Sequence, residues 1–71
     1  MSHPQDGDVL IRYLSDDDGY ELVEAITRGY LAGPFTGFLE AVFAARGLSG
    51  TLWQEVTDER GRPLGGPVQI P

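Results

Sequence analysis

Three consecutive aspartates, Asp16 to Asp18, form a cluster of carboxylates of the kind that could bind a metal ion. Calcium prefers carboxylate oxygens, but an EF-hand loop also needs Gly at its sixth position and Glu at its twelfth, and that spacing does not occur here. The run ends in an Asp-Gly pair, which favours a hairpin turn because both residues tolerate positive φ. The pattern therefore predicts a solvated turn and no metal site.

Nucleophilic catalysis requires a nucleophile, a base and a group that orients the base. The chain contains no Cys, and its one histidine, His3, lies in a polar leader. The Gly-rich run at 61–66 precedes no predicted helix whose N-terminus could bind phosphate. We therefore predict no catalytic residue and no cofactor, and a small enzyme is the least favoured function.

The charge balance bears on the class of partner. Eleven Asp and Glu face five Arg, with no Lys, and the net charge is −6. Binding to nucleic acid depends on clustered basic side chains that neutralise phosphates, whereas these arginines are scattered. An acidic chain is steered towards a basic protein surface. The charge thus favours a protein partner and disfavours nucleic acid, and no apolar run approaches the ~18–20 residues that span a membrane.

A chain of 71 residues is one domain with a thin core. The absence of Cys removes disulfides and fits a reducing compartment. Residues 1–8 lack the basic and apolar parts of a signal peptide. We expect a cytoplasmic protein with a flexible leader over 1–8 and a single domain over 9–71, and we expect association to bury further area.

The clearest predicted element is a helix after the breaker at 33–37. Thr36 is a favourable N-cap, and apolar residues recur at helical spacing from Phe38 until Gly47 ends the pattern. The helix is therefore predicted over 38–45, with Phe38 and Val42 facing the strands. Strand-like composition marks three further segments, at residues 9–14, 51–57 and 68–70.

Residues 20–35 fit two structures. As a helix, the segment places Leu22 and Ile26 on one arc and its charged side chains on the other. As two strands, 20–26 and 30–35, it has an alternation broken by Glu24, but its middle forms a three-residue hairpin with Gly29 in the left-handed position. The local pattern slightly favours the helix.

The order GY…GPFTGFLEA…DERGR resembles a family of small bacterial proteins of unknown function. The matching positions are Tyr20, Phe35, Thr36, Ala41, Asp58 and Gly61. The chain departs from the family in lacking the basic residues of its helix and last hairpin. The resemblance implies two strands over 20–35, and hence an α+β fold: a small antiparallel β-β-β-α-β-β sheet with one helix across one face. The alternative is β-α-α-β-β, and the resemblance implies no activity.

Large apolar residues lie outside the predicted core pattern. Leu39 and Phe43 fall beside the buried stripe of the helix, where either another part of the chain or a partner would cover them. Trp53 lies on the strand face opposite Leu52, where it either packs over its neighbours or forms an aromatic and arginine hot spot on an open sheet face. The residues expected to join Trp53 there are Leu10, Arg12 and Leu14.

These observations support two function classes besides the enzyme. The first is a small non-catalytic protein-interaction module that docks through an open sheet face or edge, onto a protein partner or as a weak homodimer. The second is single-stranded nucleic-acid binding by stacking on Trp53 and Tyr13, against which the acidity argues.

Overall fold

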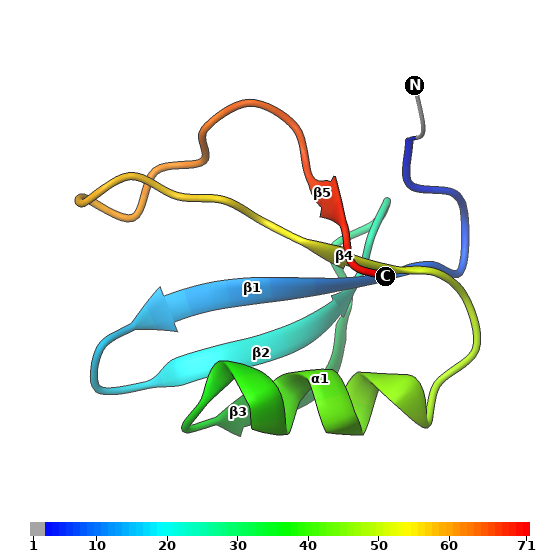
Figure 1. The fold of residues 1–71 in the computed structure, drawn as a ribbon, viewed down its shortest axis with the longest axis horizontal. Coiled ribbons are helices and arrows are strands. Elements are labelled where there is room, and N and C mark those ends of the chain that lie inside the picture. The colour runs from blue at the N-terminus through cyan, green and yellow to red at the C-terminus, as the bar shows by residue number, and fades with distance from the viewer. Residues whose placement is uncertain (1–2) are drawn as a thin grey trace.

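The computed structural model describes residues 3–71 as one five-stranded sheet with one helix (Figure 1). The elements are β1 (Val9–Ser15), β2 (Gly19–Glu24), β3 (Tyr30–Phe35), α1 (Phe38–Arg46), β4 (Leu52–Gln54) and β5 (Val68–Gln69). The predicted α+β class and the order β-β-β-α-β-β are confirmed, and the alternative β-α-α-β-β is wrong.

The sheet is mixed, although an antiparallel sheet was expected. Its strand order is β3-β2-β1-β4-β5, and β1 pairs antiparallel with β2 but parallel with β4, where Leu10 lies opposite Trp53. The reason is the connection: α1 carries the chain from the β3 edge back across the sheet, so that β4 enters in the direction of β1. Such a crossover leaves no trace in the local residue pattern.

Residues 20–35 form the hairpin β2–β3, as the resemblance implied. Glu24, which breaks the strand alternation, ends β2, and its carboxylate accepts hydrogen bonds from the backbone amides of Ile26 and Thr27. The left-handed residue of the turn is Arg28, with φ of 64°, and not Gly29 as predicted. The residue that spoils the pattern is thus the one that stabilises the turn.

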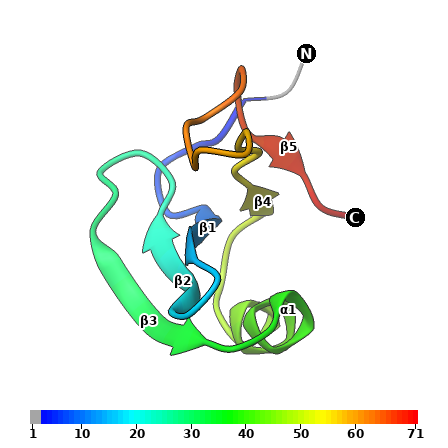
Figure 2. The same cartoon turned by 90° about the vertical axis from the view of Figure 1, so that its left-hand side faces the viewer.

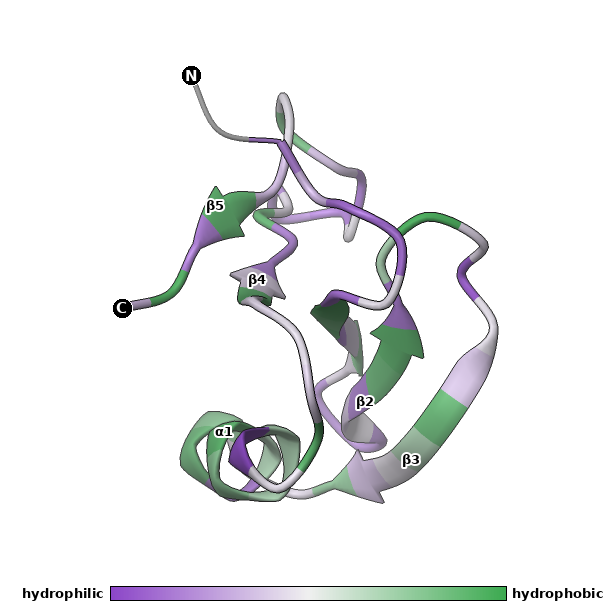
Figure 3. Ribbon diagram, turned by 90° about the vertical axis from the view of Figure 1, so that its right-hand side faces the viewer, coloured by the Kyte–Doolittle hydropathy of each residue, from purple (hydrophilic) through white to green (hydrophobic). Residues whose placement is uncertain are grey.

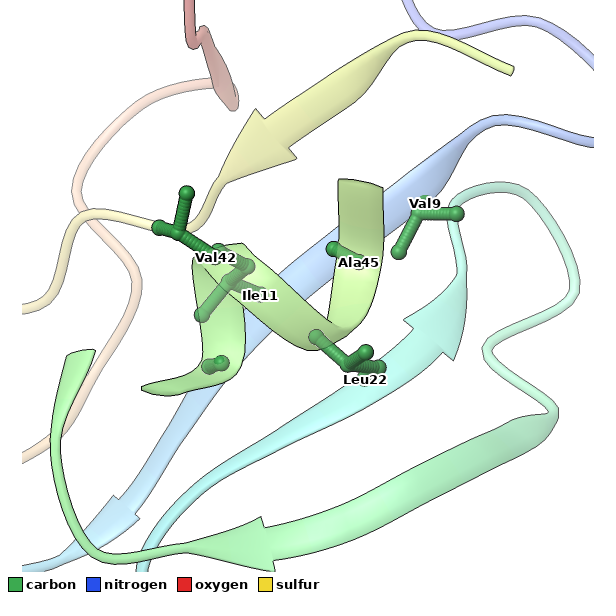
Figure 4. Close-up of a cluster of buried hydrophobic side chains, with 6 residues drawn as sticks. Val9, Ile11, Leu22, Val42 and Ala45 are labelled. Atoms are coloured by element: carbon green, nitrogen blue, oxygen red, sulfur yellow. The ribbon is translucent and has the colours of Figure 1, made fainter. Parts of the chain in front are cut away.

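Helix α1 begins at Phe38, as predicted, but its N-cap differs from the predicted one. Its N-cap is Gly37, which has no side chain with which to cap, so the prediction for Thr36 was wrong. The helix ends at Arg46 with Gly47 as its C-cap, so the helical pattern stops at Gly47 as expected. Val42 is buried, as predicted, among Ile11 and Leu22 of the sheet (Figure 4). Phe38 also packs against this core, although it stays partly exposed.

A second, smaller cluster is buried on the opposite face of the sheet and comprises Leu10, Val23, Ala25 and Trp53. It lies near the leader, whose end is part of the fold: Asp8 is buried, and its carbonyl accepts a hydrogen bond from the Ala25 amide at 2.9 Å. The expectation that this face is open was therefore wrong at this end of the sheet. The described part of the leader is bonded to the domain at Asp8.

Candidate protein-binding surface

The six residues predicted to contact a partner lie in three different environments. Leu10 and Trp53 are buried, with 0% and 3% of their surface exposed, so neither presents a hot spot to a partner. Arg12 and Leu14 are at least partly exposed on β1. Leu39 and Phe43 of α1 are 69% and 74% exposed. The structure thus brings Leu39 and Phe43 together but separates them from the others.

Trp53 is buried in a cluster with Leu10, Val23 and Ala25, and its indole N–H has a buried polar partner. Its Nε1 donates a hydrogen bond at 3.0 Å to Asp8 Oδ2, and the backbone amides of Gln5 and Thr51 donate to the same carboxylate, each at 2.9 Å. Donation by the Gln5 and Thr51 amides is the main reason that the pKa of Asp8 is lowered. An acidic residue in a polar leader gives no local signal of this role, so the sequence does not predict it.

Arg12 and Leu14 line a hollow of about 500 Å³ together with Arg28 and Glu55. The Arg12 guanidinium lies 3.8 Å from Glu21, and that of Arg28 lies 2.6 Å from Glu55. Each arginine already has a carboxylate partner within the chain. This hollow therefore offers no uncompensated positive charge.

The exposed side of α1 is more informative. Leu39 and Phe43 are four residues apart, so that their side chains are neighbours on one flank of the helix, which we name the apolar flank. Arg46 follows on the same flank, and its guanidinium donates a hydrogen bond to the Pro71 carbonyl at 3.3 Å. The apolar flank is therefore turned towards the segment that follows β5, which contacts Arg46 but leaves Leu39 and Phe43 exposed.

The sheet beside this flank also presents apolar side chains. Helix α1 contacts chiefly β1, β2 and β3, and it lies away from β5 in Figure 2. On the α1 side of β4 and β5, the register places Leu52 next to Val9 and Val68 next to Gln54. A hollow of about 300 Å³ separates the end of α1 from this region, lined in part by Leu52 and Ile70. Figure 3 shows the hydrophobic colouring of α1 and of the C-terminal segment on the same side of the molecule.

A third hollow, of about 440 Å³, lies between the β1–β2 hairpin and the segment that follows β4, and we name it the acidic hollow. Its lining residues are Tyr13, Asp16, Tyr20, Gln54, Glu55, Val56, Thr57, Asp58 and Glu59. It opens on the α1 side of the sheet, since the Tyr20 ring packs edge-on against Phe38 with centroids 5.6 Å apart. The Tyr13 hydroxyl donates a hydrogen bond to Asp16, and this bond is the main reason that the pKa of Tyr13 is raised to about 12.

Comparison with protein-family models, with curated proteins and with solved structures gives no match. The resemblance to a family of small bacterial proteins therefore stays an expectation. Over residues 3–71, no helix is long and apolar enough to cross a membrane. The same described residues contain no group of three or more His, Cys, Asp or Glu arranged to hold a metal ion.

Proposed function

We propose that this protein is a small non-catalytic protein-interaction module that docks a basic protein partner through its α1 side. The docking surface, which we name the α1 face, consists of the apolar flank and of the side of β4 and β5 that faces α1 across the hollow of about 300 Å³. The observation that carries the proposal is the exposure of Leu39 and Phe43, at 69% and 74%, side by side on one helix. Adjacent large apolar side chains at a rim of polar residues are typical of protein interfaces.

The energetic argument concerns what these side chains contribute to the fold. Residues that stabilise a thin core should be buried in it, and Val42 and Ala45 are. Leu39 and Phe43 instead expose most of their surface, which costs free energy in water at ~25 cal/mol per Å² of apolar area. A partner that covers them recovers this free energy on binding.

The net charge of the chain indicates which kind of partner binds the α1 face. With a net charge of −6, the chain attracts a basic partner and repels its own copy. A second copy therefore binds the same face only weakly. Nucleic-acid bases cannot stack on Trp53, because that side chain is buried. The proposal keeps the cytoplasmic location expected for a chain without Cys.

The test uses an uncharged amphipathic helical peptide that carries Leu and Phe on one face and Gln elsewhere. Titrated into isotopically labelled protein, it should shift the amide resonances of α1 and β5, and Phe43→Gln should weaken binding. Ile26→Gln is the matched control, since Ile26 is exposed on the β2–β3 turn. Equal weakening by both variants, or shifts centred on Arg12 and Leu14, would refute the proposal.

A further inference from the structure

The acidic hollow and the apolar flank belong to one continuous side of the molecule. Tyr20 lines the hollow and packs against Phe38, the first residue of α1, and Leu39 follows directly in the chain. The flank then runs along the helix towards Arg46. The Tyr20–Phe38 contact thus places the start of α1 beside the hollow.

The hollow carries more negative charge than the chain neutralises. Four carboxylates line it, and no basic side chain of the described residues is among the lining. Two of them have arginine partners: Glu55 lies 2.6 Å from Arg28, and Asp58 lies 3.5 Å from Arg62. Asp16 and Glu59 form no ion pair within residues 3–71, so the hollow keeps a negative potential beside an apolar surface.

The other lining groups suit an organic cation. Tyr13 and Tyr20 pack edge to face with ring centroids 5.6 Å apart, and tyrosine rings attract a guanidinium or ammonium group through cation–π interaction. Carboxylates accept hydrogen bonds from the same group. A metal ion is less suited, since the described residues bring no three ligating side chains together.

We infer that the partner presents a basic amphipathic segment to the α1 face, with an arginine or lysine side chain in the acidic hollow and apolar side chains on Leu39 and Phe43. The inference rests on the proposed function and names the chemistry of its partner. It explains why one side of the module joins an apolar flank to an unneutralised acidic hollow.

The experiment compares three synthetic helical peptides that share their Leu and Phe positions and carry Arg, Gln or Glu at the position facing the hollow. The protein variant is Asp16→Asn/Glu59→Gln. Its control is Asp6→Asn/Glu21→Gln, which changes the net charge equally but lies outside the hollow and outside α1. Dissociation constants come from calorimetry at low and high salt.

The Arg peptide should bind about two- to fivefold more tightly than the Gln peptide, as expected for partly exposed charge pairs. The higher affinity of the Arg peptide should disappear in Asp16→Asn/Glu59→Gln and persist in the control variant. It should also decrease as the salt concentration rises. Equal affinity of the three peptides, or equal loss in both variants, overturns the inference while the proposed function stands. Failure of every peptide to bind overturns the proposed function and this inference with it.

Discussion

Truncation of two residues on one helix distinguishes the core of this protein from its proposed binding surface. Val42 is 8% exposed and packs with the buried residues of β1 and β2, whereas Leu39 is 69% exposed. Val42→Ala removes two buried methyl groups, which at ~0.8 kcal/mol each gives about 1.6 kcal/mol, and a residual cavity raises the expected loss to about 1.5–2.5 kcal/mol. Leu39→Ala removes more carbon but should change the free energy of unfolding by under ~0.5 kcal/mol.

Urea unfolding measures both effects, followed by the fluorescence of Trp53, the single tryptophan. Because both variants place Ala in the same helix, differences in helix propensity stay small beside the expected gap. If Leu39→Ala destabilised the protein as much as Val42→Ala, Leu39 would be covered by the chain itself. The apolar flank could then not be assigned to a partner.

Three further outcomes are expected. The lowered pKa of Asp8 means that its ionised form stabilises the fold above 3.8, its ordinary value, and that this contribution disappears as the pH falls through the lower folded value. Asp8→Asn should therefore lower the urea midpoint at neutral pH, and the gap to the wild type should close in acid. Tyr13 should ionise at about 12, as a late phase in the phenolate absorbance that Tyr13→Phe removes and Asp16→Asn moves back towards 10.0. Sedimentation should detect a weak homodimer that strengthens near 1 M salt, where screening falls to ~3 Å, and that Phe43→Gln weakens; a strict monomer at both salts leaves only the heterologous partner.

The sequence predicted the fold where local chemistry determines it. Helical spacing around Val42 marked α1, and the turn at Asp18-Gly19 is confirmed, with φ of 80° at Gly19. The β2–β3 hairpin was harder, because Glu24 breaks the strand alternation for the sake of the turn. Only the family resemblance favoured strands there.

The candidate surface was predicted in part. Leu39 and Phe43 were identified because a helix pattern shows which residues fall off its buried stripe. Trp53 was correctly placed on the face of Leu10, but its burial was missed. Its polar partner Asp8 is 45 residues away, and a single side-chain hydrogen bond over that distance leaves no periodic signal. The parallel pairing of β4 with β1 was missed for the same reason, since strand direction depends on the path of the connection.

If the α1 face receives a basic amphipathic segment, intermolecular nuclear Overhauser effects will detect it in the complex of the Arg peptide with the wild-type protein. We expect contacts from the peptide's Leu and Phe side chains to Leu39 and Phe43. We also expect contacts from its arginine methylenes to the rings of Tyr13 and Tyr20. Contacts confined to Arg12 and Leu14 on the opposite face of the sheet would contradict this expectation.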